Sequence, residues 1–381
     1  MKSSEKIRVA VLFGGRSAEH EVSLQSAKNV VHFLDTDHFE VVPIGVDKQG
    51  NWFLGHDVLV NSLKHNKVLR LEDESHAWFT PEWASKPVEL SKKLNTQQDT
   101  SHSKFDVLFP AMHGSFCEDG TLQGLLELAN LPYVGSGVLA SAVGMDKDFS
   151  KRIAISAGVK VTPYVVIKLD VWKHNPERFI ETIKEKLSFP VFVKPANTGS
   201  SIGITKVKEI SQLSSAIDEA LRFDTKIIVE KALNVQEIEI AVLESIDNSD
   251  EPIVSVAGEV IPTSREFYSY EAKYLDDKGA DLLIPANISQ ETAEKARAMA
   301  KAIFIAHDCE GMARVDLFLD KDSNEMYFNE INTLPGFTEI SMYPRLMAES
   351  GVTYTDLLTH LIKLAMNRHV NKNKLSRNHS D

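Results

Sequence analysis

Residues 312–332 read MARVDLFLDKDSNEMYFNEIN, and this stretch decides how we interpret the fold. Two runs rich in apolar residues flank the turn-forming segment KDSNE, a pattern that predicts a β-hairpin. Arg314 and Asp316 are two residues apart, so they point to one face of the first strand. Glu330 and Asn332 have the same spacing in the second strand. A turn centred on KDSNE sets Asp316 about opposite Glu330.

This hairpin face combines oxygen-donating side chains without histidine or cysteine. Such a set suits a hard cation such as Mg²⁺, which keeps water ligands and takes substrate phosphates as further ligands. The alternative is a half-exposed hairpin with a polar face. The site is favoured because the chain runs directly into TLPGFTEIS (333–341), a glycine turn whose N–H groups can receive a carboxylate or an oxyanion.

The chain around this hairpin predicts a larger α+β unit. We expect strands at 237–244 and 252–262, a helix at 290–308 and a final helix near 353–366. The remaining residues, 367–381, are polar, and we expect them to form a frayed tail.

The segment before this unit has a different pattern of apolar and polar residues, which predicts a smaller α+β unit. FPVFVKP (189–195), GITKV (203–207) and KIIVEKAL (226–233) are expected strands, and 210–223 is an expected helix. Lys194 ends a strand and leads into a Gly/Ser loop whose N–H groups can wrap phosphate oxygens. A flexible hairpin with a solvated lysine is the alternative. The neighbouring Glu230 could hold an adenine edge, which favours a nucleotide cleft.

The first 145 or so residues predict an α/β layer with a parallel sheet. KIRVAVLFGG (6–15) indicates a strand and a glycine turn, and the residues that follow have helical spacing. Buried strands are also expected at 39–47 and 105–114, while 56–104 is polar and is interpreted as a surface excursion. A helical stretch over 138–158 joins this layer to the next unit.

Polar residues gather at two turns of this first layer. GGRSAEH (14–20) lacks the G-x-G-x-x-G spacing, which argues against a dinucleotide site. Glu19 either belongs to simple helix capping or faces a ligand ammonium at the carboxyl end of the sheet. In HGSFCEDGTLQG (113–124), His113 either lines a site or satisfies a loop carbonyl while Asp119 caps a helix.

One long segment, 265–288, alternates aromatic and charged residues without a sustained period. Loops of this length without structure of their own are usually lids or disordered. The aromatic content argues for an ordered lid that excludes water from a reactive intermediate, with a surface loop as the alternative.

The length and the net charge of the chain limit its possible functions. A chain of 381 residues favours two or three domains, and its net charge of −12 leaves no basic face for nucleic acid or an anionic membrane. The two cysteines are too few for a disulfide framework, which fits a reducing compartment. The N-terminal apolar run is too short for a signal peptide, so we expect a cytoplasmic protein.

Taken together, these motifs resemble the D-alanine:D-alanine ligase family of the ATP-grasp superfamily. The resemblance runs in order from residue 8 to about 345. The segments that carry it are GGRSAEHEVSLQSA, HGSFCEDGTLQG, VGMDK, FVKPANTGSSIG, VEKAL, FYSYEAKYLDD, MARVDLF and FNEINTLPGFTEISMYP.

The resemblance implies a three-domain architecture, with ATP held between two antiparallel sheets and D-alanine activated as an acyl phosphate. The implied domains are an N-terminal α/β substrate domain (1–147), a central ATP-grasp subdomain (148–235) and a C-terminal catalytic domain (236–366), followed by the polar tail 367–381. It also implies a homodimer that uses D-alanine and ATP in peptidoglycan precursor synthesis, with no nucleic-acid or membrane partner.

The resemblance further implies roles for single residues at the amino-acid subsites. Glu19 receives the ammonium of the first D-alanine with His113 nearby, and Ser200 and Tyr274 complete a hydrogen-bond network with Glu19. The oxyanion site matches Arg314 and the N–H of Gly336, and the carboxylate of the second D-alanine falls at Ser341 and Met342.

Further matches concern ATP and metal. Lys147, Lys194 and Lys273 would touch the ATP phosphates. Adenine and ribose would be held by Glu230, Lys231, Leu233 and Glu237. Asp316, Glu330 and Asn332 match the ligands of two divalent ions, Mg²⁺ or Mn²⁺, in agreement with the hairpin argument.

Two departures from the family pattern stand out. Cys117 replaces a frequent glycine, which matters only if that position needs a positive φ. The excursion at 56–104 is longer than in the smallest members. Three rival functions stay open at this point: a nucleotide-binding oxidoreductase, a non-catalytic ATP-grasp binding module, and a ligase that uses D-lactate as acceptor.

Overall fold

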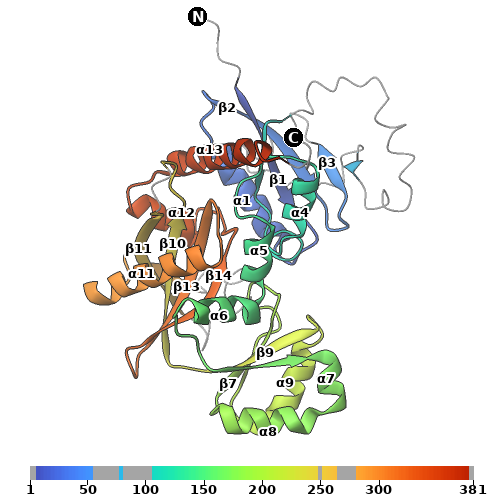
Figure 1. Cartoon of the computed structure of the whole chain (residues 1–381), viewed down its shortest axis with the longest axis vertical. Coiled ribbons are helices and arrows are strands. Elements are labelled where there is room, and N and C mark those ends of the chain that lie inside the picture. The colour runs from blue at the N-terminus through green and yellow to red at the C-terminus, as the bar shows by residue number, and fades with distance from the viewer. Residues whose placement is uncertain (1–5, 55–76, 80–104, 248–250, 264–279, 377–381) are drawn as a thin grey trace, which may run out of the picture.

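The computed structural model describes residues 6–54, 77–79, 105–247, 251–263 and 280–376, which form three sheets with helices packed against them (Figure 1). Each sheet is built from one of three successive parts of the chain. This confirms the combination of α/β and α+β units predicted from the sequence. Among the helices described, none is both long enough and apolar enough to cross a membrane.

The first sheet has the strand order β4-β3-β2-β1-β5. Its strands are β1 (Ile7–Gly14), β2 (Phe39–Val46), β3 (Trp52–Leu54), β4 (Ala77–Phe79) and β5 (Val107–Pro110). β1 pairs in parallel with both β2 and β5, as predicted, whereas β3 and β4 add an antiparallel edge. Within the excursion predicted at 56–104, only 77–79 lies among the described residues, and it forms that edge.

The turn after β1 depends on a glycine. Gly14 has a φ of 91°, and a Cβ there would lie 2.1 Å from the carbonyl oxygen of Val46. Only glycine fits this close approach of two parallel strands. The chain then enters α1 (His20–Phe33), which packs on β1, while α4 (Thr121–Leu128) follows the turn after β5.

Two helices, not one, join the first layer to the rest of the chain. The helical stretch expected over 138–158 consists of two helices, since α5 (Val138–Met145) stops and α6 (Lys147–Ser156) starts anew. Asp146 separates them with an extended backbone, and its side chain accepts hydrogen bonds from the N–H groups of Asp148 and Phe149. This N-cap fixes the direction in which α6 presents Lys147.

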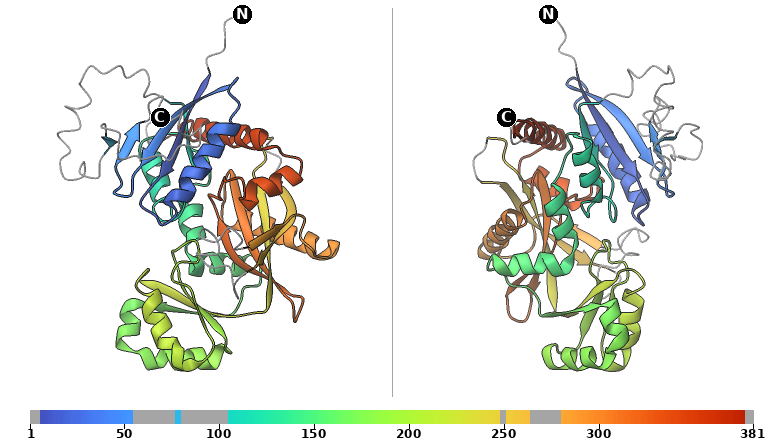
Figure 2. Two further views of the ribbon diagram at one scale, coloured as in Figure 1. Left: turned by 180° about the vertical axis from the view of Figure 1, so that it is seen from behind. Right: turned by 45° about the vertical axis from the view of Figure 1, so that its right-hand side comes forward.

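The second part of the chain forms an antiparallel sheet of order β6-β9-β7-β8 with a hydrophobic core of its own. It lies at one end of the molecule in all views (Figures 1 and 2). Its elements are β6 (Tyr164–Lys168), α7 (Leu169–His174), α8 (Pro176–Lys186), β7 (Val191–Pro195), β8 (Thr205–Val207), η4 (Ile210–Gln212), α9 (Leu213–Ala220) and β9 (Lys226–Lys231).

The third part forms an antiparallel sheet of order β12-β11-β10-β13-β14, which α11 and α12 contact, and α5 and α6 contact its edge strand β14. Its elements are β10 (Val235–Leu243), β11 (Ile253–Pro262), β12 (Ala280–Leu283), α11 (Gln290–Ala306), β13 (Met312–Asp320), β14 (Met326–Asn332) and α12 (Met342–Glu349). The predicted hairpin register is confirmed, since Asp316 pairs with Glu330 and Arg314 with Asn332.

The segment interpreted as a lid, 265–288, is only partly described. Its residues up to 279 lie outside the described part of the chain. The expectation that the whole segment lacks regular structure is wrong for 280–283, which pair with β11 as the edge strand β12.

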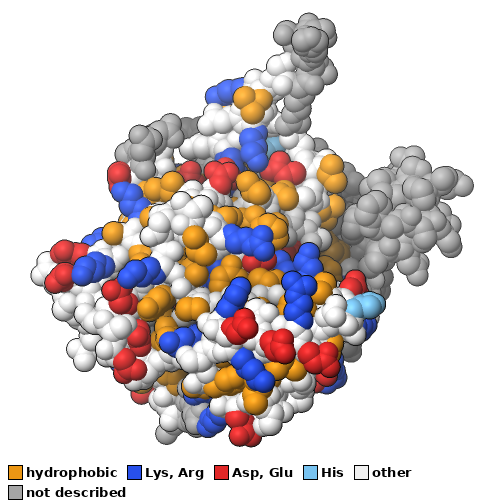
Figure 3. All heavy atoms as spheres, turned by 60° about the horizontal axis from the view of Figure 1, so that its bottom comes forward, with side chains coloured by type: hydrophobic (Ala, Val, Ile, Leu, Met, Phe, Trp, Pro, Cys, Tyr) orange, Lys and Arg blue, Asp and Glu red, His pale blue; other side chains and the backbone are white. Residues whose placement is uncertain are grey.

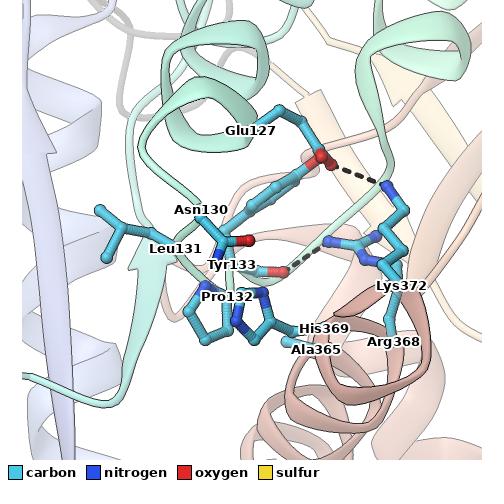
Figure 4. A pocket seen from close by; sticks show the side chains of 9 residues that line it. All are labelled: Glu127, Asn130, Leu131, Pro132, Tyr133, Ala365, Arg368, His369 and Lys372. Atoms are coloured by element: carbon cyan, nitrogen blue, oxygen red, sulfur yellow. Dashed lines mark hydrogen bonds and ion pairs between the residues drawn. The ribbon is translucent and has the colours of Figure 1, made fainter. Parts of the chain in front are cut away.

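The last helix, α13 (Tyr354–Asn373), returns to the first domain and contacts β5 and α1. The polar tail expected from residue 367 is wrong for 367–373, because the helix continues through them. Figure 4 shows why: Arg368 reaches from α13 to the segment after α4. Its guanidinium donates to the carbonyls of Tyr133 (2.7 Å) and Gly135 (2.6 Å) and pairs with Glu310 (3.0 Å).

We expect Arg368→Ala to lower the free energy of unfolding by about 2 to 3 kcal/mol, because two carbonyls and a carboxylate lose a partly buried partner. Lys372→Ala, one turn further along α13, is the matched control. Lys372 pairs with Glu127 at 2.7 Å, but the two side chains are 41% and 36% exposed, so the loss should stay below about 1 kcal/mol. Urea unfolding of both variants checks this, and equal losses would contradict the bracing role of Arg368.

The surface at the end that carries the second sheet is mixed in charge. In Figure 3, basic and acidic side chains are interspersed among apolar ones across the face in view. No extended basic surface is seen there among the described residues.

Candidate active site

The parts of the chain meet at a small cavity. Side chains and backbone from the turn after β5, from α6, from the loop after β7 and from β14 line it. They include Glu118, Lys147, Thr198, Gly199, Glu330 and Asn332. Residues that the sequence analysis assigned separately to metal and phosphate binding therefore share one space.

An arginine on the hairpin face is bound by two carboxylates. Arg314 donates from Nε to Oδ1 of Asp316 and from Nη2 to Oδ2, each at 2.7 Å. Glu239 lies opposite Asp316 on the neighbouring strand β10, with its Oε2 3.1 Å from Arg314 Nε. Burial opposes the charge of Arg314, but Asp316 and Glu239 outweigh it and raise its pKa well above the usual value. Arg314 is thus a fixed, permanent cation.

The hairpin donors fit a divalent cation in chemical type. Asp316 and Glu330 provide carboxylate oxygens, and Asn332 contributes an amide whose Nδ2 donates to Asp316 Oδ2 at 3.1 Å. Among the described residues, no three side chains of the types His, Cys, Asp and Glu are grouped to hold a metal. A metal here would therefore need the amide oxygen of Asn332, phosphate oxygens or water beside the two carboxylates.

Two of the three predicted phosphate lysines are held by acidic partners, and one of them, Lys147, lines the cavity. Lys147 Nζ lies 3.2 Å from Oε2 of Glu330 and donates to the carbonyl of Thr198 at 2.8 Å. Lys194 Nζ lies 2.6 Å from Oε2 of Glu230. Lys147 thus connects α6, the Gly/Ser loop and the hairpin in one contact.

Glu230 also forms an ion pair with a second lysine. Lys151 Nζ lies 2.6 Å from its Oε1, and Thr162 donates a hydrogen bond to the same oxygen. Burial alone would raise the pKa of Glu230, but Lys151 and Lys194 outweigh it and lower the pKa to about 2. Because both carboxylate oxygens are engaged, Glu230 can meet an adenine through its backbone without breaking this cluster.

The charged form of Glu230 should stabilise the fold above the usual carboxyl pKa of about 4.3 and lose that effect as the pH falls toward 2. Lys151→Met leaves burial opposed by Lys194 alone, so the pKa of Glu230 should rise. We expect the urea midpoint of this variant, measured from pH 7 to 3, to fall less than that of the parent below about pH 4.3, because the loss begins at the pKa of the unfolded chain and ends at that of the folded protein. Lys160→Met, at an exposed pair with Glu325, is the control. Curves that stay parallel for parent and Lys151→Met would contradict the cluster.

The predicted contact between Ser200 and Glu19 is present, since the Ser200 hydroxyl donates to Oε1 of Glu19. Ser200 and Ser201 both have left-handed backbones, with φ of 52° and 58°. Such conformations are costly for residues other than glycine and cluster at functional sites. A Cβ at Gly114 would lie 2.4 Å from Oε2 of Glu19, so the turn after β5 also closes on this carboxylate.

His113 directly precedes Gly114, but its ring contacts residues other than Glu19. Its Nε2 lies 2.8 Å from the hydroxyl of Ser26, and its Nδ1 lies 3.6 Å from Glu118 Oε1. Burial raises the pKa of Glu118. Gly114, Phe116 and Gly120 have positive φ in this turn, but Cys117 does not, so the departure at Cys117 has no backbone consequence.

The loop after β14 contains the predicted oxyanion and second-substrate residues. Ser341 donates its N–H to Thr338 O at 3.0 Å, and its hydroxyl accepts from Thr338 N at 2.9 Å. A Cβ on Gly336 would lie 2.8 Å from Ser341 Oγ, so the loop folds tightly on itself. Met342 is buried and begins α12.

The remaining predicted residues are less closely grouped. Lys231 ends β9, Leu233 follows it, and Glu237 lies in β10; all three are half-buried. Lys273 and Tyr274 lie outside the described residues.

Sequence reasoning missed several charged residues of this site. Lys151 is four residues after Lys147 and so lies on the same face of α6, and Glu239 is two residues after Glu237 in a strand. Both spacings are visible in the sequence and could have predicted that these residues belong to the site. Glu118 gave no such signal, because its role depends on a turn that approaches His113.

Comparisons with known proteins agree with this geometry. The family model described as D-ala D-ala ligase N-terminus matches residues 8–136, and the one described as D-ala D-ala ligase C-terminus matches residues 153–363. The chain is 46% identical to D-alanine--D-alanine ligase A of Bradyrhizobium diazoefficiens, over 99% of this chain and 100% of the relative. It is also 46% identical to D-alanine--D-alanine ligase A of Escherichia coli, over 97% and 99%.

Solved structures give the same result. The D-Ala:D-Ser ligase from Enterococcus faecalis superposes with a TM-score of 0.76 at 35% identity, covering 95% of this chain and 100% of that one. The D-alanine-D-alanine ligase from Coxiella burnetii superposes with a TM-score of 0.74 at 32% identity, covering 97% of both chains.

Proposed function

This chain belongs to the D-alanine–D-alanine ligase family, and from that premise we propose a role for each residue of the site. It is an ATP-dependent ligase that joins two D-alanines into D-alanyl-D-alanine for peptidoglycan synthesis. ATP is its co-substrate. The proposed domains 1–147, 148–235 and 236–366 each contribute to the cavity or to its supporting contacts.

In the first half of the reaction, the carboxylate of one D-alanine attacks the γ-phosphate of ATP, giving D-alanyl phosphate and ADP. A carboxylate and a triphosphate repel each other, so cations must neutralise the phosphate oxygens and hold them in line. Lys147, Lys194 and Lys273 take this role. Support comes from the pair of Lys147 with Glu330 at the cavity and from the pair of Lys194 with Glu230, which hold the two ammonium groups in place.

Adenine and ribose are assigned to Glu230, Lys231, Leu233 and Glu237, on and after β9. Lys151 and Thr162 both bind Oε1 of Glu230, so this carboxylate keeps a lysine partner when Lys194 turns toward phosphate.

Two divalent ions, Mg²⁺ or Mn²⁺, are assigned to Asp316, Glu330 and Asn332. When bound, they supply positive charge against the phosphate oxygens. The support is the donor chemistry and the paired strand register of these residues.

The first D-alanine is placed with its ammonium at Glu19 and His113 nearby, while Ser200 and Tyr274 extend the hydrogen-bond network of Glu19. The hydrogen bond from Ser200 to Glu19 supports this assignment. The second D-alanine places its carboxylate at Ser341 and Met342, at the start of α12.

In the second half, the amine of the second D-alanine attacks the acyl carbon, phosphate leaves, and the amine loses a proton. The tetrahedral oxyanion is stabilised by Arg314 and the N–H of Gly336, an interaction worth about 3 to 4 kcal/mol per donor. Asp316 and Glu239 hold the guanidinium of Arg314 in place before the oxyanion charge develops.

We further propose that the enzyme acts in the cytoplasm as a homodimer, without a nucleic-acid or membrane partner. Two buried free cysteines and the use of ATP support the compartment. The net charge of −12, with basic and acidic side chains interspersed on the face drawn in Figure 3, argues against nucleic acid. The dimer rests on the family resemblance alone, and sedimentation velocity would test it.

The observation that carries this proposal is the shared cavity in which Lys147 meets both Glu330 and the Gly/Ser loop. We expect ADP release with Mg²⁺-ATP and D-alanine, a dipeptide product by mass spectrometry, and little release with L-alanine. D-serine and D-lactate belong in the same assay, because one structural relative is a D-Ala:D-Ser ligase. A product containing D-serine or D-lactate in preference to a second D-alanine would change the assigned acceptor.

A further inference from the structure

The backbone of Phe337, directly after the proposed oxyanion donor Gly336, is held on both sides by side chains from distant helices. Its N–H donates to the hydroxyl of Ser26 at 3.2 Å. Its carbonyl accepts from Asn29 Nδ2 at 3.1 Å and from the Tyr354 hydroxyl at 2.6 Å. Ser26 and Asn29 lie three residues apart in α1, hence on one face of that helix.

These contacts lie in the interior of the protein. Ser26 is 0%, Phe337 1% and Asn29 5% exposed. The Phe337 ring also packs edge-on against Phe109 of β5, with ring centroids 5.4 Å apart. In such surroundings a hydrogen bond holds its geometry well, and an unsatisfied partner is costly. The loop of the third part of the chain is therefore fixed against the first domain.

Ser26 has a second partner on the side of the first substrate. Its oxygen lies 2.8 Å from Nε2 of His113, whose Nδ1 faces Glu118. A serine hydroxyl has one proton to give and two lone pairs to receive. Because the Phe337 N–H fills one lone pair, the Ser26 hydroxyl can still donate its proton to Nε2 or accept a proton from it through the second lone pair. In both arrangements one oxygen contacts the oxyanion loop and the His113 ring.

We infer that Ser26 is a positioning residue that connects the pocket of the first D-alanine to the oxyanion loop. It fixes the peptide plane after Gly336 through Phe337 and orients His113 with the same oxygen. Asn29 supports the next peptide plane. This inference rests on the proposed function, since it concerns the acyl-transfer half of that reaction.

Ser23 provides a matched control on the same helix. It is also 0% exposed, and its hydroxyl likewise bridges two backbone groups, accepting from Gly14 N and donating to Ala111 O at 2.7 Å each. Neither partner belongs to the oxyanion loop. Ser26→Ala and Ser23→Ala therefore each remove from α1 one buried hydroxyl that makes two hydrogen bonds.

The test measures two quantities in both variants. One is steady-state kcat with KM for ATP; the other is the positional isotope exchange of ATP labelled in its β,γ-bridge oxygen, measured with D-alanine present and divided by turnover. Exchange reports reversible formation of the acyl phosphate, and turnover requires acyl transfer as well.

We expect Ser26→Ala to lower kcat about 10- to 100-fold with KM for ATP within about twofold, because a displaced loop misplaces the oxyanion donor. Its ratio of exchange to turnover should rise. Asn29→Ala should change both quantities in the same direction but less, since Tyr354 still holds the Phe337 carbonyl. Ser23→Ala should keep kcat within about twofold at a comparable loss of thermal stability.

Equal losses of kcat in Ser26→Ala and Ser23→Ala, or an unchanged ratio of exchange to turnover in Ser26→Ala, would overturn the positioning role. Absence of any exchange in the parent enzyme would instead contradict the acyl-phosphate reaction itself, and the inference would fall with it.

Discussion

Arg314→Ala is expected to lower kcat by about 100- to 1,000-fold while KM for ATP rises much less, because the oxyanion that Arg314 stabilises exists only along the reaction path. The side chain is poised for this in the free protein. Two carboxylates, Asp316 and Glu239, bind its guanidinium. Steady-state kinetics with ATP and D-alanine varied separately measure the effect.

Arg314→Lys is the informative companion. Lysine keeps the charge but loses the planar fork that meets Asp316 at two points. Its kcat should fall between those of the parent and the alanine variant. Because alanine leaves Asp316 and Glu239 without their cation, thermal unfolding of both variants must accompany the kinetics. A rise in KM for ATP with unchanged kcat would assign Arg314 to nucleotide binding instead.

Glu330→Gln is expected to leave a folded protein whose turnover at low Mg²⁺ falls by more than about tenfold. An amide fills the same space but offers no anionic charge to the ion. Stability should hardly change, since Lys147 keeps its hydrogen bond to Thr198. Binding of Mn²⁺ in the presence of ATP, measured calorimetrically, gives a readout that does not depend on turnover.

Glu325→Gln is the matched control, because Glu325 lies at the turn of the same hairpin and pairs with exposed Lys160. It should bind Mn²⁺ as the parent does. Parental turnover of Glu330→Gln at low Mg²⁺ would show that the hairpin face is not the metal site.

The hairpin could be predicted in detail from the sequence. Alternation in two strands and a polar turn are local properties, so the pairing of Asp316 with Glu330 followed from counting residues. The strand, glycine turn and helix that begin the chain were predictable for the same reason. The hydrogen bond between Ser200 and Glu19 was available only through the family resemblance, because 181 residues separate the two.

Features set by tertiary contacts could not be predicted in this way. The break between α5 and α6 depends on Asp146, whose side chain also pairs with Lys226 on β9. Residues 367–373 look like a tail in the sequence, and they are helical because Arg368 finds its partners on another domain. Ser26 and Asn29 look like ordinary polar residues of an amphipathic helix until Phe337 is placed beside them.

The return of α13 to the first domain affects how the chain can fold during synthesis. Leu357, Leu358, Leu361 and Ile362 of α13 belong to the same hydrophobic core as the residues of β1 and β5. About 350 residues separate the end of β1 from the end of that contact, which at ribosomal rates of about 5 to 20 residues per second corresponds to roughly 20 to 70 s. During that interval the apolar side of the nascent first sheet lacks its final cover. We therefore expect this domain to be a substrate for ribosome-associated chaperones until the last helix emerges.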